Sequence, residues 1–197
     1  MRIGIDIDGV LTDVKKWQLD YASKFFAEKY NMKIINYKGY EISDIFDVDD
    51  KLDNEFWDTY YDEYCTNIEC RRFAGEVIKK LKDEGHEIYI ITARYLTNRK
   101  DKIGKKYQDV VLNWLDKNKI QYDKIIYSPE DKLNICIEEK IDLMIEDKVD
   151  NIMKISDIIP VICFHANYNE QCIRKNVIRC YSWYDIYMNI RELNDSI

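Results

Sequence analysis

Two aspartates one residue apart, Asp6 and Asp8, end an apolar run near the start of the chain and are followed by Gly9. The isoleucine-rich run before them predicts a buried strand. Acidic residues are depleted inside strands, so the pair is expected where the strand stops. Ligands of open α/β sheets bind beyond the carboxyl ends of the strands. Because two carboxylates there repel each other unless a cation or a proton holds them, we expect magnesium-assisted chemistry in an acidic cleft.

Residues suited to phosphate chemistry also follow three later strands that the sequence predicts. They are Thr92-Ala93-Arg94 after a strand at 87–91, Lys132 after a strand at 124–127, and Glu146-Asp147 after a strand at 141–145. Parallel strands place their carboxyl ends along one edge of a sheet, so we expect these side chains to face one small volume. A turn, a helix start or a solvated surface would explain any one of them alone. Together they favour a single site with a nucleophile, a hydroxyl, a fixed cation and metal-binding acids.

The segment from Asp6 to Asp13, DIDGVLTD, resembles the first motif of the haloacid dehalogenase superfamily of phosphatases. The threonine after the second strand, the later lysine and the acidic pair after the fourth strand match the remaining motifs of that superfamily, in order. More specifically, the chain resembles the 5′(3′)-deoxyribonucleotidases. This similarity includes Asp131-Lys132, Leu143 to Asp147, Phe164 to Asn167 and Tyr181 to Trp183. It covers nearly the whole chain and is weakest in the segment after the first strand.

The resemblance implies a reaction and a role for each residue of the site. Asp6 would attack the phosphorus of a phosphate monoester and form an aspartyl-phosphate. Asp8 would protonate the leaving alcohol and then deprotonate the hydrolytic water. Mg²⁺ would be held by Asp6, the backbone carbonyl of Asp8 and Asp147. The residues implied to bind the phosphate are Thr92, Ala93, Arg94 and Lys132.

Four positions depart from the pattern of the mammalian nucleotidases or add to it. Glu146 stands in place of an aspartate, and we expect it to support the metal site. Asp150 either reaches the metal shell or is an exposed residue at a helix start. Val14 stands where an aromatic stacking residue is expected, which leaves a preference for pyrimidine deoxynucleotides open. Arg94 adds a charge after the threonine, and it either binds a second anionic group or closes over the phosphate.

The composition of this 197-residue chain is that of a soluble globular protein, with 46% hydrophobic and 34% charged residues. Its net charge of −7 argues against binding to long nucleic acids but allows a small anionic substrate beside a local cation. No apolar stretch has the length of a signal peptide or a membrane span, so we expect a cytoplasmic protein without a membrane partner. The oligomeric state stays open, with a homodimer as one alternative.

The six cysteines form no Cys-x-x-Cys pair, and we expect them to be reduced. A zinc site at Cys163, His165 and Cys172 is an alternative. The spacing of these three residues does not match a zinc motif and favours buried thiols with a structural histidine.

Alternating strand and helix patterns predict the elements that position the site. Helices are expected at 14–30, 53–64, 73–84, 107–115, 133–140 and 182–193. A fifth strand is expected at 158–164, and its Pro160 suits only an edge position. Alternating strands and helices of this kind predict an α/β fold, a three-layer Rossmann-like parallel sheet.

Nearly 80 residues separate the first strand from the second, far more than a crossover connection needs. We interpret the excess as a small helical cap, residues 14–75, inserted after the first strand of a core made of residues 1–13 and 76–197. Most aromatic side chains of the cap are four residues apart and are assigned to its own packing. Tyr40 and Phe46 lie in a less regular stretch and are the candidates for contact with a nucleobase.

The sequence thus favours a magnesium-dependent phosphatase acting on small phosphate monoesters, with nucleoside monophosphates as the leading substrates. One alternative keeps this chemistry but uses a sugar phosphate or another metabolite. The other is a regulatory protein that accepts or binds phosphate on a similar fold. Asp8 favours turnover, because a stable phosphoaspartate gains nothing from an adjacent acid–base carboxylate.

Overall fold

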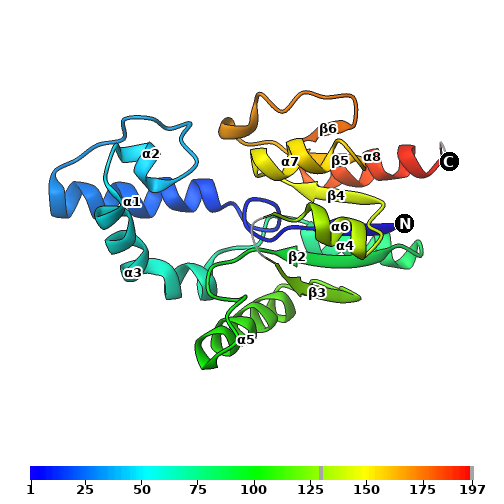
Figure 1. Cartoon of the computed structure of the whole chain (residues 1–197), viewed down its shortest axis with the longest axis horizontal. Helices are drawn as coiled ribbons and strands as arrows, with labels where there is room; N and C mark the ends of the chain where they lie inside the picture. The colour runs from blue at the N-terminus through cyan, green and yellow to red at the C-terminus, as the bar shows by residue number, and fades with distance from the viewer. Residues whose placement is uncertain (129–130, 196–197) are drawn as a thin grey trace. The chain divides into compact units, whose positions relative to one another are not determined.

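The computed structural model describes residues 1–128 and 131–195 (Figure 1). Within these ranges, four helices follow the first strand, and single helices then alternate with strands from the second strand to the fifth. Pro129 and Glu130, which precede Asp131 in the chain, lie outside the described residues. The strands are β1 (Arg2–Ile5), β2 (Glu87–Thr92), β3 (Lys124–Tyr127), β4 (Leu143–Glu146), β5 (Val161–Phe164) and β6 (Val177–Cys180). The helices are α1 (Val14–Tyr30), α2 (Ile42–Phe46), α3 (Asp50–Asn67), α4 (Ala74–Asp83), α5 (Lys102–Lys117), α6 (Leu133–Glu138), α7 (Val149–Ile155) and α8 (Trp183–Asp195), with a 3₁₀ turn at Asn167–Asn169.

The described strands form one parallel sheet in the order β3-β2-β1-β4-β5-β6. The chain builds the sheet outward from β1 to β3 and then returns to the other side of β1 with β4. The strand order therefore reverses between β1 and β4, where Ile5 pairs with Ile145. In open α/β sheets, this switch point is where ligands bind.

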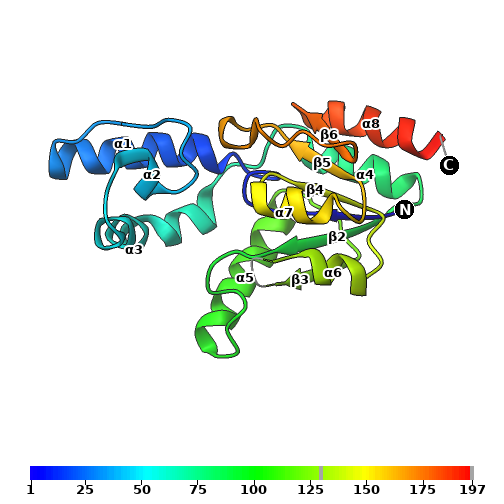
Figure 2. The same ribbon diagram turned by 45° about the horizontal axis from the view of Figure 1, so that its top comes forward.

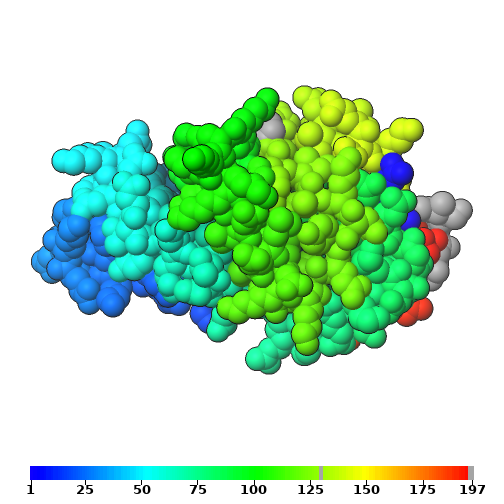
Figure 3. Space-filling view, turned by 90° about the horizontal axis from the view of Figure 1, so that it is seen from below, coloured from blue at the N-terminus to red at the C-terminus, as the bar shows by residue number. Residues whose placement is uncertain are grey.

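Helices lie on both faces of the sheet, so the predicted three-layer α/β fold is confirmed (Figures 1 and 2). Helices α6 and α7 cover one face, above a buried cluster that includes Ile91, Met144 and Ile152. Helices α4 and α8 pack against each other on the opposite face. On the side seen in Figure 3, the green and yellow-green surface belongs to α5 and to the segments around β3 and α6. Both sheet faces are thereby buried, which accounts for the isoleucine-rich strands.

The chain divides into two compact units, each described by itself. The sheet unit contains residues 1–12 and 70–197, and the helical unit contains residues 13–69. The sheet unit resumes at Cys70, where an antiparallel bridge joins this residue to Thr12. Residues 70–75 therefore belong with the sheet, six positions earlier than the boundary expected from the sequence.

The helical unit is held together by aromatic packing among α1, α2 and α3. Phe26 stacks on Phe46 with ring centroids 4.6 Å apart, and Phe25 meets Phe56 edge-on at 5.7 Å. Asp13 caps α1 by accepting a hydrogen bond from the backbone N–H of Lys16. Large buried rings of this kind give a small helical unit a core of its own.

Two expectations for the end of the sheet were wrong. Strand β5 is not an edge strand, because it pairs with both β4 and β6. Pro160 lies just before β5, where its carbonyl accepts a hydrogen bond from the backbone N–H of Met144 and no proline N–H is needed. The edge is formed by β6, a strand that the sequence did not indicate.

No helix within residues 1–128 and 131–195 combines the length and the apolar character needed to cross a membrane.

Candidate active site

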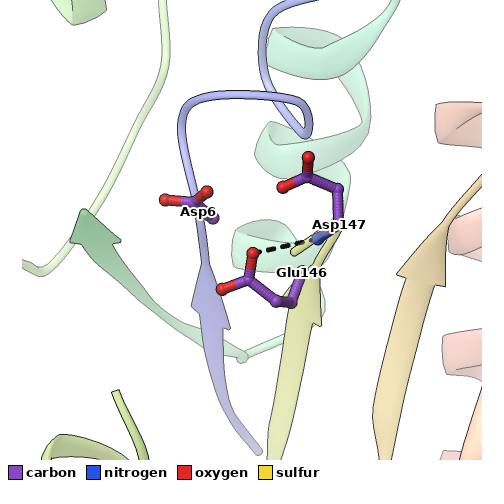
Figure 4. Close-up of side chains that lie close together, drawn as sticks. All are labelled: Asp6, Glu146 and Asp147. Atoms are coloured by element: carbon purple, nitrogen blue, oxygen red, sulfur yellow. Dashed lines mark hydrogen bonds between the residues drawn. The ribbon is translucent and has the colours of Figure 1, made fainter. Parts of the chain in front are cut away.

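Three buried acidic side chains meet at the switch point between β1 and β4 (Figure 4). Asp6 follows β1, Glu146 ends β4, and Asp147 comes next in the chain. Carboxylate oxygens of the three residues lie within 4.8 Å of one another. The backbone N–H of Asp6 donates to the carbonyl of Ile145 at 3.1 Å, which fixes the two strand ends side by side. The sheet thus brings together the first and fourth strand ends, as the sequence predicts.

Gly9 allows the loop after β1 to pass close to the acidic group. Its φ of +87° lies in the left-handed region, and a Cβ at this position would lie 2.0 Å from Oδ2 of Asp147. Arg71 braces the same loop by donating from Nε to the carbonyl of Thr12 at 3.0 Å and from Nη2 to that of Gly9 at 3.2 Å. The guanidinium of Arg71 also lies 4.3 Å above the ring of Phe164. Arg71 therefore holds the loop at Gly9 and at Thr12.

Lys132 places a buried positive charge between two of the acids. Its Nζ lies 2.6 Å from Oδ1 of Asp6 and 3.0 Å from Oε2 of Glu146, and the residue is only 2% exposed. Asn151 also donates to Oε2 of Glu146. The other oxygen of Glu146 accepts the backbone N–H groups of Asp147 and Lys148, each at 3.0 Å. Glu146 therefore fixes the ammonium and the turn after β4.

Burial and mutual repulsion govern the protonation of this group. Burial raises the pKa of Asp6 to about 7; Lys132 opposes the rise, and the charges of Glu146 and Asp8 add to it. Burial, together with Glu146 and Asp6, raises the pKa of Asp147 well above its usual range. Burial also acts to raise the pKa of Glu146, but Lys132 and the backbone N–H donors outweigh it and the net pKa is lowered.

Asp147 is held on one side only. The hydroxyl of Tyr168 donates to its Oδ2, whereas its buried Oδ1 has no hydrogen-bond partner within residues 1–128 and 131–195. Asn169 donates to the carbonyl of Asp147 at 2.9 Å and is itself held by Arg179 at 2.8 Å. A buried carboxylate oxygen without a donor is costly, so this atom is suited to a ligand that the protein does not supply.

The acidic group fits a hard divalent cation. If ionised, its three carboxylates and the single ammonium of Lys132 leave an excess of two negative charges. Oxygen donors at close range are the ligands that Mg²⁺ prefers, and Oδ1 of Asp147 is available. Among the described residues, this is the group of acidic, cysteine and histidine side chains close enough to share an ion, and it does not include Cys163, His165 or Cys172.

The end of β2 contributes a hydroxyl and a guanidinium. Thr92 is fully buried, and its Oγ1 accepts the backbone N–H of Arg94 at 3.2 Å, so its own hydrogen can be donated elsewhere. Ala93 between them is partly exposed. The guanidinium of Arg94 makes a two-pronged ion pair with Asp8, in which Nε lies 3.1 Å from Oδ2 and Nη2 contacts Oδ1. The Asp8 carboxylate thus faces Arg94 rather than the acidic group.

Three further candidates lie elsewhere. Asp150 is exposed in the first turn of α7. Of the two roles expected for it, a metal ligand or a residue at a helix start, its position in the structure matches the second. Phe46 is fully buried in the helical unit, so the expectation that its ring contacts a base was wrong: the ring has no exposed face to offer. Tyr40 is partly exposed and remains a candidate.

Four residues that organise the site were not found from the sequence alone: Arg71, Tyr168, Asn169 and Arg179. Tyr168 and Asn169 directly follow the segment Phe164 to Asn167, which resembles the nucleotidases, so that similarity was the available signal. Arg71 acts on a loop about 60 residues earlier in the chain, and no local pattern points to such a contact.

Comparison with known proteins identifies the family. Residues 1–194 match the family model described as 5′ nucleotidase, deoxy (pyrimidine), cytosolic type C protein. A nucleotidase of Clostridium acetobutylicum is 29% identical over 189 residues, which cover 95% of this chain and 92% of that protein.

Solved structures of low identity share the fold. A haloacid dehalogenase family hydrolase of Deinococcus radiodurans, with bound phosphate and sodium, aligns with a TM-score of 0.63 at 12% identity, over 98% of this chain and 96% of that chain. A D,D-heptose 1,7-bisphosphate phosphatase of B. bronchiseptica, complexed with magnesium and phosphate, aligns with a TM-score of 0.56 at 9% identity, over 98% and 99%. Together with the family match, the fold and the acidic site, these findings show that the chain belongs to the cytosolic type C 5′-nucleotidase family, on a haloacid dehalogenase fold, and hydrolyses phosphoric monoesters.

Proposed function

We propose that this protein is a magnesium-dependent phosphatase of small phosphate monoesters, with nucleoside monophosphates as its substrates and an aspartyl-phosphate on Asp6 as its intermediate. The observation that carries the proposal is the buried group at the switch point, in which Lys132 lies 2.6 Å from Asp6 and Oδ1 of Asp147 has no protein donor among the described residues. This arrangement suits the binding of a cation at Asp147 and of an anion at Lys132.

In this proposal, Asp6 attacks the phosphorus and the bond to the leaving oxygen breaks, with a proton passing from Asp8 to the leaving alcohol. Asp8 then takes a proton from a water molecule that attacks the phosphorus of the aspartyl-phosphate, and Asp6 is released. Lys132 and the hydroxyl of Thr92 hold the phosphoryl oxygens, where negative charge must be offset during transfer.

Asp6, Asp147 and the backbone carbonyl of Asp8 are the residues proposed to hold Mg²⁺. The cation supplies charge compensation between an anionic nucleophile and an anionic substrate. Support comes from the donor set itself and from the structurally similar heptose bisphosphate phosphatase, which was solved with magnesium and phosphate. Glu146 supports this centre indirectly, because it accepts a hydrogen bond from the ammonium of Lys132.

The helical unit, residues 13–69, is proposed as the cap that selects the substrate, with Tyr40 as a base-contacting residue. The family description supports a cytoplasmic location. The net charge of −7 disfavours long nucleic acids as partners.

A panel of monophosphates tests the proposal. With Mg²⁺ present, kcat/KM is measured for nucleoside 5′- and 3′-monophosphates, sugar phosphates and p-nitrophenyl phosphate, and each assay is repeated with excess chelator. We expect nucleoside monophosphates to have the highest kcat/KM and chelation to abolish turnover. A preference of about tenfold or more for non-nucleotide esters, which corresponds to about 1.4 kcal/mol, would remove the nucleotide assignment. Unchanged turnover in chelator would remove the metal assignment.

A further inference from the structure

Arg94 forms a closer ion pair with Asp8 than is expected of an arginine that must be available to bind the substrate. Nε lies 3.1 Å from Oδ2 of Asp8, and Nη2 contacts Oδ1, so both carboxylate oxygens are engaged by one planar group. The Arg94 side chain is 1% exposed, against 26% for that of Asp8. Trp114 of α5 lies on the guanidinium, with its ring centroid 6.0 Å away. The arginine is thus buried, and its partner is the more exposed of the two.

The loop after β2 is built so that Arg94 takes this position. The backbone N–H of Arg94 donates to Oγ1 of Thr92, and its carbonyl accepts from Thr97, at 2.6 Å from the hydroxyl and 3.2 Å from the backbone N–H. Gln108 of α5 donates to the carbonyl of Thr97 at 2.7 Å. Leu96 completes the turn with a φ of +67°, a left-handed conformation that a leucine adopts only when its surroundings enforce it.

We propose that Arg94 is a positioning residue: its guanidinium holds the carboxylate of Asp8 in the orientation from which a proton is passed to the leaving oxygen. This inference rests on the proposed function of Asp8. A planar two-pronged pair fixes the rotation of the carboxylate, which a single hydrogen bond would leave free. Each Asp8 oxygen keeps a second lone pair, so one of them can carry the transferred proton while Arg94 stays in place.

The main rival role for Arg94 is direct binding of the substrate phosphate, and the two roles predict different kinetics. Proton donation matters for an alkyl monophosphate, whose leaving alkoxide is strongly basic. It matters little for p-nitrophenyl phosphate, whose leaving phenolate is stable without a proton. Phosphate binding matters equally for both esters. The ratio of the two effects therefore separates positioning from binding.

The test compares Arg94→Met with the wild-type protein in the presence of Mg²⁺. We expect kcat/KM for the best nucleoside or alkyl monophosphate of the panel to fall about 100-fold, the scale of general acid catalysis. The value for p-nitrophenyl phosphate should fall less than about tenfold. Inhibition by inorganic phosphate should stay within about threefold, because the phosphate site is intact. Equal losses on the two esters with weakened phosphate inhibition would assign Arg94 to phosphate binding and overturn the proposal.

A second variant addresses the risk that a buried arginine is needed for folding. Arg94→Ala leaves a cavity beside Trp114 in which guanidinium chloride can act, and we expect guanidinium to restore alkyl ester hydrolysis while methylammonium does not. Arg99→Met is the matched control, since Arg99 lies in the same loop but is about half exposed and pairs with Asp101. It should keep wild-type activity on both esters.

The outcomes distinguish this inference from the proposed function. Loss of alkyl ester hydrolysis without rescue, or no loss in either Arg94 variant, would contradict the positioning role while wild-type turnover stands. A wild-type protein that hydrolyses no ester of the panel would instead contradict the proposed function of the site.

Discussion

At the scale of single residues, Gly9 carries the tightest constraint on the site. It combines a φ of +87° with a position where a side chain would meet the carboxylate of Asp147. Gly85 has nearly the same φ, +86°, but nothing lies within 4 Å of the position its Cβ would take. A side chain at either position would strain the backbone, but only at Gly9 would it also clash with a neighbour. Substituting each glycine therefore distinguishes the effect of backbone strain from that of steric contact.

Gly85→Ala should lower the free energy of unfolding by about 1–2 kcal/mol through backbone strain alone, with kcat/KM unchanged. Gly9→Ala should lower it further and reduce kcat/KM by about 100-fold, because the Asp147 carboxylate must shift. Urea denaturation and steady-state kinetics of the two variants measure these effects. Equal kinetics for the two variants would show that Asp147 tolerates displacement.

Sequence patterns predicted the residues of the acidic group because each one follows a strand whose apolar run is easy to read. They did not predict that the Asp8 carboxylate pairs with Arg94, since strand ends can be ordered from sequence while the direction of a side chain cannot. Tyr168 and Arg71 were missed for a related reason. They act on residues 21 and 62 positions away, through contacts that exist only after the sheet has formed.

At the scale of elements, the predictions succeeded where a helix has a long periodic pattern or a strand has an unbroken apolar run, and failed where a charged residue interrupts a short strand. Helix α1 was expected at 14–30 and occupies that range, with an Asp13 cap to start it. Strand β6 was missed because Val177–Cys180 is four residues long and includes Arg179, which interrupts its apolar run. Pro160 was misread because the true β5 begins one residue later. A proline next to a strand costs no ladder hydrogen bond.

Helix α1 also contains a buried lysine, Lys15, which makes the stability of the protein depend on pH. The ammonium of Lys15 donates to the carbonyl of Gly39 within the helical unit. Burial lowers the pKa of Lys15 from its ordinary 10.5 to about 8, although Asp44 opposes the shift. Between these two pH values the unfolded chain binds more protons than the folded chain. The free energy of unfolding therefore rises with pH across that window.

We expect this rise to be about 1–2 kcal/mol between pH 8 and pH 10, measured by urea denaturation followed by far-UV circular dichroism. Lys15→Met should remove it, because the unfolded and folded chains then bind the same number of protons at this position. Lys16→Met, which changes the exposed neighbour, should leave it in place. An identical rise in Lys15→Met would place its origin elsewhere in the chain.

At the scale of the whole molecule, the chemistry is concentrated in one unit. The residues proposed for catalysis and phosphate binding, from Asp6 to Asp147, belong to the sheet unit, and the helical unit supplies none of them. The parallel α/β sheet could be predicted from alternating strands and helices, whereas the strand order, and with it the switch point that locates the site, comes from the structure. Substrate identity could not be predicted in this way, because aromatic side chains serve both core packing and base contact, as buried Phe46 illustrates.

The negative charge of the protein affects how an anionic substrate can bind at the site. In a protein with a net charge of −7, three ionised site carboxylates beside one buried ammonium repel a phosphate monoester unless a cation offsets the excess. In the proposed function, the Asp6 carboxylate is both a ligand of the cation and the nucleophile.

Hydrolysis of p-nitrophenyl phosphate by Asp6→Asn, with Mg²⁺ present, tests this claim most directly. Asparagine keeps the size of the side chain but is a poor nucleophile, so kcat should fall at least about 1,000-fold. Asp116→Asn, which changes an exposed carboxylate on α5, should retain the wild-type kcat, and thermal unfolding shows whether both variants fold. A folded Asp6→Asn protein with wild-type kcat would contradict the assignment of Asp6 as the nucleophile.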